Sequence, residues 1–345
     1  MTMKRRLLAI GFALGVGMSG AIAAESLVAP EQRRGTEQTY LTYPEWFLVH
    51  SPAEYAVLVN TRPATDFPFM THVAQLWSSY EAVTGEQLRD KYPLNAGYHA
   101  MILVIASSTT VEYVLRAAYE NTIGRVSFLL GGQQLTAEDK FAAEAAQDYV
   151  DFIRQQPWYL FDFTSRLKAL WTGVPLKGPG FIRKLERRYA LTTEYLIKAV
   201  YGKMIEKATR ATYEPALMTT RVVLNRAPVL SGGDTDIKIV KVMPDGRAVA
   251  DLPRYYNFRI AATNLARQGV DLIDVAGNTS DILVTVWAPD NMPYQLGHTR
   301  LLFTQTLITR PGQSRLGLVV PVAQLSNFLL HAPEHGMIVE HVYDY

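Results

Sequence analysis

The sequence predicts an α+β protein, with an N-terminal all-helical domain built from an internal duplication and a C-terminal α+β domain. Three observations predict this fold. Two blocks of sequence recur in the same order, their apolar residues repeat at helical spacing, and after Met218 apolar residues alternate with a period of two. The predicted order is a signal peptide at 1–24, a lead-in segment at 25–52, the duplicated helical domain at 53–218 and the α+β domain at 219–345.

The first 24 residues are typical of an export signal. Residues 4–6 are basic, the stretch 7–24 is uncharged, and alanines on either side of Ile22 fit a signal-peptidase site. We therefore expect cleavage before Ala24 or Glu25 and a mature protein in the periplasm or cell envelope. An uncleaved N-terminal membrane anchor is the alternative, because about 18 apolar residues can just cross a bilayer.

Composition excludes several classes of site. The 345 residues contain no cysteine, which excludes a Cys nucleophile, an iron–sulfur cluster, a zinc finger and a redox pair. Loss of the three basic signal residues changes the formal net charge from +2 to −1, so a nucleic-acid partner loses its electrostatic support. No motif indicates a cofactor. Residues 25–165 are acidic overall, whereas residues 166–210 contain 11 basic and 3 acidic residues.

The first recurring block pairs residues 54–69 with residues 148–163 at an offset of 94. A tyrosine, a proline and two phenylalanines coincide, and the match continues without a gap to a Leu-Trp pair at 76–77 and 170–171. The aligned proline predicts the end of a helix, since the residue before proline is pushed out of helical geometry. The block therefore predicts a helix, an aromatic turn and a second helix.

The second block pairs residues 110–125 with residues 192–207 at an offset of 82. Both copies have the apolar spacing of amphipathic helices. The predicted units are thus 53–125 and 147–207, each ending in a long helix. Because such a unit cannot bury its apolar face alone, we expect the two units to pack together about a pseudo-twofold axis.

Period-two alternation dominates the last third of the chain. Strands are predicted at 236–243, 248–252, 270–275, 282–287, 301–309, 316–320 and 337–343, with helices at 256–268 and 322–331. This order is compatible with a decorated ferredoxin-like sandwich.

Three histidines near residue 340 form a candidate metal site. His331 and His335 match the spacing of an H-x-x-E-H zinc motif, and His341 lies close in sequence. Pro333 and Gly336 oppose the helix that would place both imidazoles on one face. We therefore interpret this segment as a polar turn, with the three-histidine metal site as the alternative.

Glu112 and Glu194 occupy equivalent positions in the two units, so a pseudo-twofold axis could bring two carboxylates together for acid–base chemistry. Arg116 and Lys198 follow each of them by four residues. Helix salt bridges are the simpler interpretation of that spacing, and a shared functional carboxylate pair is the alternative.

Two segments suggest contact with a membrane. Residues 94–111 are uncharged over 18 residues, but their polar side chains favour a buried helix over a transmembrane segment. A second segment carries four clustered basic residues, which could rest on anionic headgroups: Arg183, Lys184, Arg187 and Arg188. We favour the interpretation that these four are solvated or pair with the acidic first unit, with contact to headgroups as the alternative.

The sequence specifies no reaction. Our first hypothesis is a non-enzymatic envelope protein, whose helical domain docks on an anionic membrane surface or binds another envelope protein. The second is an extracytoplasmic hydrolase that uses the histidine cluster or the paired glutamates. No small-molecule ligand is indicated.

Overall fold

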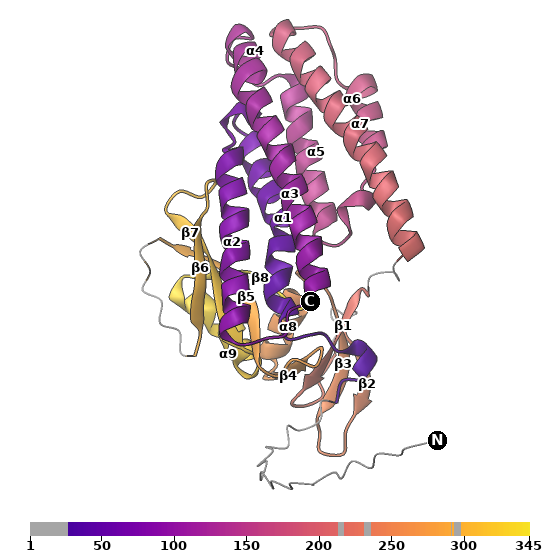
Figure 1. Ribbon diagram of the computed structural model, residues 1–345, viewed down its shortest axis with the longest axis vertical. Helices are drawn as coiled ribbons and strands as arrows, with labels where there is room; N and C mark the ends of the chain where they lie inside the picture. Colours follow the sequence, from indigo (N-terminus) through magenta and orange to yellow (C-terminus); the bar gives the residue numbers. More distant parts are fainter. Residues whose placement is uncertain (1–26, 213–216, 231–235, 291, 293–297) are drawn as a thin grey trace, which may run out of the picture.

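A computed structural model describes residues 27–212, 217–230, 236–290, 292 and 298–345, so the predicted signal peptide lies outside the described residues. An N-terminal helical region, 30–207, precedes a C-terminal region of two antiparallel four-stranded sheets and helices. The protein is therefore α+β. Figure 1 shows the helices as an elongated bundle with the sheets towards one end.

The helical region contains seven α-helices in its described residues: α1 (Gln38–Val59), α2 (Phe69–Arg89), α3 (Ala96–Tyr119), α4 (Arg125–Leu130), α5 (Ala137–Ile153), α6 (Phe163–Gly173) and α7 (Phe181–Thr212). A π-helical turn, η3 (Glu120–Gly124), joins α3 to α4. Helix α1 begins within the segment 25–52 that the sequence predicts as a separate lead-in. Pro44 and Pro52 lie inside this helix. Because proline usually ends a helix, the sequence does not predict one helix across both positions.

The C-terminal region contains eight strands and two α-helices in its described residues: β1 (Thr219–Leu224), β2 (Lys238–Val242), β3 (Ala248–Pro253), α8 (Tyr256–Arg267), β4 (Leu272–Val275), β5 (Asp281–Pro289), β6 (Arg300–Thr306), β7 (Gln313–Pro321), α9 (Val322–His331) and β8 (Ile338–Val342). The strand orders are β2-β3-β1-β4 and β6-β7-β5-β8.

The two sheets have the same topology. In each, three strands, a helix and a fourth strand follow one another along the chain, and the paired strands are antiparallel. The register also shifts at matching places, between Val223 and Leu224 in one sheet and between Thr285 and Val286 in the other. The predicted order of elements is compatible with a ferredoxin-like sandwich but does not specify two sheets, since alternation identifies strands but not their partners.

One core joins the sheets to their helices. Val222 and Val284, from the central strands of the two sheets, are buried in the same cluster as Phe258 of α8 and Leu325 of α9. A second cluster joins the helical region to the sheet of β5–β8. There Tyr40 and Tyr43 of α1 pack with buried residues of the sheet and of the segment after β8, namely Leu283, Val319 and Tyr343.

Two parts of the helical region make the same aromatic contacts 94 residues apart. Tyr55 packs edge-on against Phe67 with ring centroids 5.1 Å apart, and Tyr149 packs edge-on against Phe161 at 5.2 Å. A short 3-10 turn precedes each phenylalanine, η2 (Ala64–Asp66) in the first part and η4 (Trp158–Leu160) in the second. Helices α2 and α6 then begin at equivalent positions.

A tryptophan hydrogen bond also recurs. The indole Nε1 of Trp77 donates to Thr110 Oγ1 at 2.9 Å, and Nε1 of Trp171 donates to Thr192 Oγ1 at 3.1 Å. Each bond ties the second helix of a unit to its long last helix, α3 or α7. These four residues are the ones that the two offsets align.

Candidate functional site

Two long stretches of helix in the helical region contain no exposed charged residue between positions 96 and 124 and between positions 181 and 202. Helix α3, the π-helical turn and α4 make one continuous stretch of 35 residues, Ala96–Leu130. Each charged residue within 96–124, namely Glu112, Arg116 and Glu120, is buried or half-buried. In α7, residues 181–202 contain seven charged residues, and none of these is exposed.

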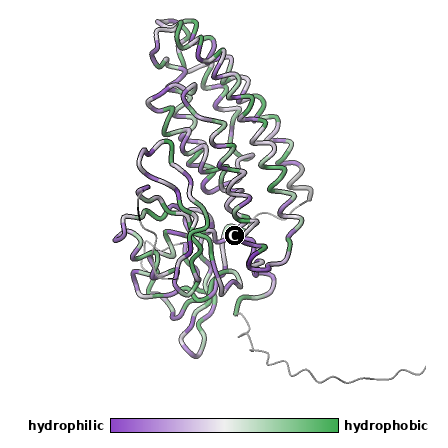
Figure 2. Tube along the Cα trace, turned by 60° about the vertical axis from the view of Figure 1, so that its left-hand side comes forward, coloured by the Kyte–Doolittle hydropathy of each residue, from purple (hydrophilic) through white to green (hydrophobic). Residues whose placement is uncertain are grey.

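Apolar side chains take the outward positions on these helices. The exposed large apolar residues of 96–124 and 181–202 are Met101, Leu103, Val104, Val111, Val114, Leu115, Ile123, Phe181, Ile182, Leu185, Tyr189, Leu196, Ile197, Val200 and Tyr201. We call them the α3–α7 face. Figure 2 shows hydrophobic and hydrophilic residues alternating along the helices, as expected when each helix has one side of each kind.

This arrangement is the reverse of a water-soluble bundle, in which charged residues are mostly exposed. Among the described residues, Ala96–Leu130 is the one helical stretch long and apolar enough to cross a membrane, and 28% of its most apolar 18-residue window is buried. A core helix of a soluble protein would be mostly buried. The stretch therefore does not owe its apolar composition to packing inside the protein.

Behind the face, the predicted carboxylates form a ring with two cations. Glu112 lies 3.6 Å from Arg116 and 3.4 Å from Lys198, and Glu194 lies 3.7 Å from Arg116 and 2.7 Å from Lys198. Burial alone would raise the pKa of Glu194, but Arg116 and Lys198 lower it to about 2. Each carboxylate is thus held between two cations, which suits a clamp between α3 and α7 better than proton transfer.

The four basic residues at the start of α7 are buried rather than displayed. Arg183 lies 2.8 Å from Asp139 and 2.9 Å from Glu186, and it also donates to the carbonyl oxygen of Gly124 at 3.1 Å. Burial opposes the charge of Arg187, but nearby carboxylates raise its pKa well above the ordinary value.

The other three residues also have acidic partners. Lys184 and Arg188 lie 3.2 and 3.0 Å from the two oxygens of Glu138, and Arg187 lies 2.9 Å from Glu120. The four cations therefore pair with acidic residues of the first unit and of α5, and in this structure they do not face outward. The exposed residues of this part of α7 are instead apolar: Phe181, Ile182, Leu185 and Tyr189. Sequence spacing shows that charges and apolar residues occupy opposite sides of a helix, but not which side faces out.

The three candidate metal-binding histidines are not brought together. His331 and His335 are exposed near the end of α9, and His331 contacts Glu334 at 3.0 Å. His341 is buried on β8, where its ring stacks on Trp46 at 3.6 Å, and burial holds its pKa well below the ordinary value. Among the described residues, no group of three acidic or histidine side chains is placed to hold a metal ion.

A buried polar network joins α1 to the sheet of β5–β8, and sequence reasoning missed it. Arg315 of β7 binds Glu340 of β8 at 2.7 Å and Glu54 of α1 at 3.2 Å. His50 of α1 lies between Glu340, at 3.2 Å, and the hydroxyl of Tyr343, at 2.8 Å. The residues from α1 lie more than 250 positions before the others, so no motif of fixed spacing could reveal the network.

The electrostatics of this network favour one ionisation state. Burial would raise the pKa of Glu340, but Arg315 and His50 hold it well below the ordinary value. Burial lowers the pKa of His50, although Glu340 opposes that effect. A neutral imidazole between a carboxylate and a hydroxyl can relay a proton in principle. All of these side chains are buried at the contact of α1 with the sheet, so we interpret the network as a link between the two regions.

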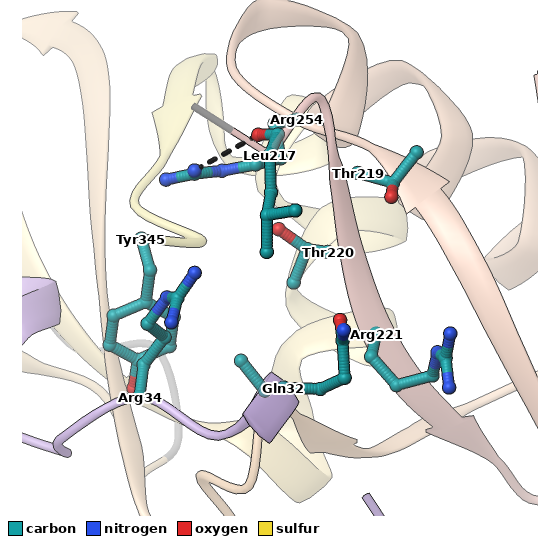
Figure 3. Close-up of a pocket in the computed structure, with 9 residues that line it drawn as sticks. Gln32, Arg34, Leu217, Thr219, Thr220, Arg221, Arg254 and Tyr345 are labelled. Atoms are coloured by element: carbon teal, nitrogen blue, oxygen red, sulfur yellow. Dashed lines mark hydrogen bonds between the residues drawn. The ribbon is translucent and has the colours of Figure 1, made fainter. Parts of the chain in front are cut away.

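A small pocket lies where the segment before α1 meets β1 (Figure 3). Its volume is about 10 Å³, enough for about one water molecule. Arg34, Arg221 and Arg254 are among the residues that line it, and Arg254 donates to the carbonyl oxygen of Leu217 at 3.1 Å. The pocket is too small for an organic substrate.

Comparisons with protein-family models, with curated proteins and with solved structures find no match for this chain. Inference about function therefore rests on the residues and surfaces described above.

Proposed function

We propose that this chain is an exported, non-enzymatic envelope protein whose helical region lies on a membrane through the α3–α7 face. The observation that carries the proposal is that none of the ten charged residues within 96–124 and 181–202 is exposed as a whole residue, the most exposed of their side chains being that of Glu112, at 42%. Soluble monomers rarely expose contiguous apolar patches larger than a few hundred Å². Such a face needs an apolar partner.

Several features favour lipid as that partner. Interfaces between proteins usually carry about one hydrogen bond per 100–200 Å² and are rich in Arg; the α3–α7 face offers few polar groups and no exposed guanidinium. Exposed lysines flank residues 181–202 of α7 at both ends, Lys177 on one side and Lys203 and Lys207 on the other. Lysines at these positions can reach anionic headgroups while the apolar residues enter the bilayer.

Charged residues elsewhere in the bundle suggest how the protein lies. Helix α5 exposes the charged residues Lys140, Glu144, Asp148 and Asp151, which lipid cannot surround cheaply. The face therefore lies in the plane of the interface, as amphipathic helices do. The predicted export signal at 1–24 is consistent with an envelope location.

We also propose that residues 53–125 and 147–207 are two copies of one helical unit. The repeated aromatic contacts, the repeated Trp–Thr hydrogen bond and the shared charge ring support this proposal. In the ring, each unit supplies one carboxylate and one cation, and each pairs with the other unit. This crossing is expected of two like units related by a twofold axis.

The binding proposal is preferred to the hydrolase alternative. That alternative requires either the histidines or the paired glutamates to be free for chemistry. His331 and His335 are exposed and apart from buried His341, and Glu112 and Glu194 are each held between two cations.

Vesicle flotation tests the membrane proposal. The mature protein should float with vesicles of phosphatidylcholine and phosphatidylglycerol, and the double variant Leu115→Glu/Ile197→Glu should lose at least nine-tenths of that binding. Val229→Glu is the control, because Val229 is 82% exposed but lies outside the face. Wild-type protein that stays at the bottom of the gradient, or a double variant that still floats, would contradict the proposal. A detergent-free dimer that ignores vesicles would assign the face to a second copy instead.

A further inference from the structure

In the first helical unit, one face of α1 and α2 is covered by the extended segment at the end of β6. Gln75 of α2 donates from Nε2 to the carbonyl oxygen of Thr306 at 3.0 Å, and Gln305 donates to the carbonyl oxygen of Gln75 at 2.9 Å. The backbone N–H of Ile308 donates to Glu54 of α1 at 3.2 Å. The end of β6 and the residues after it therefore lie along α1 and α2.

The equivalent face of the second unit is open. At an offset of 94, the buried first-unit residues Glu54, Leu58, Phe67, His72 and Gln75 correspond to Asp148, Phe152, Phe161, Arg166 and Ala169. The second set is half-buried or exposed at every position. In both units this carboxylate lies near the matching side chain of the next helix, with Glu54 3.9 Å from the neutral His72 and Asp148 2.6 Å from Arg166. The second unit thus has the equivalent face, but no segment of the described chain covers it.

This open face is hollowed into a groove of about 420 Å³. Its lining residues are Phe152, Leu160, Phe161, Asp162, Ser165, Arg166 and Ala169. Gln75, whose amide bonds the covering backbone in the first unit, is replaced by the smaller Ala169. The second unit therefore has apolar space where the first has a polar contact.

The other sheet of this chain is a poor cover for the groove. The two sheets can be compared pair by pair. Val222–Ala250 on β1 and β3 corresponds to Val284–Leu318 on β5 and β7. At the next step along these strands, the first sheet has Arg221–Asp251 where the second has Leu283–Val319. Leu283 and Val319 pack against α1, whereas Arg221 and Asp251 form an ion pair. A charged sheet face cannot replace the apolar one without loss of hydration.

We propose that the groove between α5 and α6 binds an extended, strand-like segment of a partner protein, which inserts an aliphatic side chain between Phe152, Phe161 and Ala169. The proposal rests on the equivalence of the two units and not on membrane binding. Asp148 would accept a backbone N–H of that segment, as Glu54 accepts one from Ile308. Strand-like segments bind in this way because backbone bonds give affinity and side-chain pockets give selectivity.

The charges of the groove define the partner further. In the first unit the covering sheet brings a cation, Arg315, to Glu54. In the second unit, Arg166 already supplies a cation to Asp148. A segment that fills this groove therefore needs no basic residue at that position, and an uncharged aliphatic segment fits best.

Fluorescence polarisation of a labelled peptide tests this inference on the full mature chain. The probe is the peptide TQTLITR, which has the sequence of residues 304–310 and contains the segment that covers the first unit. We expect it to bind wild-type protein, and Ala169→Trp, which fills the groove, to weaken binding at least tenfold. Lys168→Trp is the matched control, because Lys168 is exposed on the same helix and does not line the groove. We expect binding to this control to match the wild type.

No peptide binding at millimolar concentration, or equal binding to wild type and to Ala169→Trp, would overturn the proposal. Vesicle flotation of Ala169→Trp separates this test from the membrane proposal, since the groove does not include the α3–α7 face. A folded Ala169→Trp variant that floats normally yet fails to bind the peptide would support a separate protein-binding site.

Discussion

Lys198 lies 3.4 Å from Glu112, a carboxylate that belongs to the other helical unit, as well as 2.7 Å from Glu194 on its own helix. A pair four residues apart on one helix would hold the helix alone. Here each cation spans two helices, so the charges fix how α3 lies against α7.

Glu194→Gln tests the ring. Because the folded-state pKa of Glu194 is lowered to about 2, its ionised form stabilises the fold above the unfolded value of about 4.3 and loses that effect as the pH falls towards 2. We expect the variant to lower the free energy of unfolding by about 2 kcal/mol at pH 7. Urea unfolding should show a smaller difference at pH 3, and Glu144→Gln, on an exposed residue, should show little at either pH.

Arg183→Met tests the buried charge cluster at the start of α7. Removal of the guanidinium leaves Asp139 and Glu186 without this partner in the protein interior, so we expect a loss of about 3–5 kcal/mol in the free energy of unfolding. Lys203→Met on the same helix changes an exposed residue and should cost less than about 1 kcal/mol. Equal effects of the two changes on the urea midpoint would contradict the assigned pairing.

Asp344→Asn should make the protein more stable at pH 8. Burial raises the pKa of Asp344 to about 7, so folding binds a proton between about pH 4 and pH 7, and stability falls as the pH rises through that window. An amide removes this cost and can still accept the hydrogen bond from Thr220. We expect a gain of about 1–3 kcal/mol at pH 8 and almost none at pH 4. A variant less stable than wild type at pH 8 would refute the raised pKa.

N-terminal sequencing of the protein from the cell envelope tests export. We expect the mature chain to begin at Ala24 or Glu25, because residues 1–24 have the charge and apolar pattern of a signal peptide. A chain that begins at Met1 or Thr2 would instead support an N-terminal anchor.

Local sequence predicted the elements of the fold better than their partners. The alignment of Tyr55 and Phe67 with Tyr149 and Phe161 predicted a helix, an aromatic turn and a helix in each unit, and both parts of the chain have that succession. No comparable sequence repeat predicted that the two sheets share one topology. Strand pairing depends on contacts distant in sequence, such as that of Val284 with Val342, which alternation does not specify.

The same limit applied to the candidate site. The four basic residues at 183–188 were recognisable as one side of a helix, but apart from Glu186 their acidic partners lie 44 to 67 residues earlier. A row of basic residues with few acidic residues near it in sequence has the pattern of a solvent-exposed helix side. The interpretation as internal packing required the position of α5 against α7, which only the folded chain provides.

The bond between Thr39 and Tyr343 sets a limit on the order of folding. The Thr39 hydroxyl donates to the carbonyl oxygen of Tyr343 at 2.8 Å and accepts the backbone N–H of Leu283, so the first helix of the bundle is completed by residues from near the other end of the sequence. During synthesis the tyrosines of α1 cannot pack against the sheet until roughly 300 further residues have been made. At about 5–20 residues per second this interval lasts on the order of 15–60 seconds. A chaperone or translocation partner that shields α1 in that interval would act on an early, unfinished form of the protein.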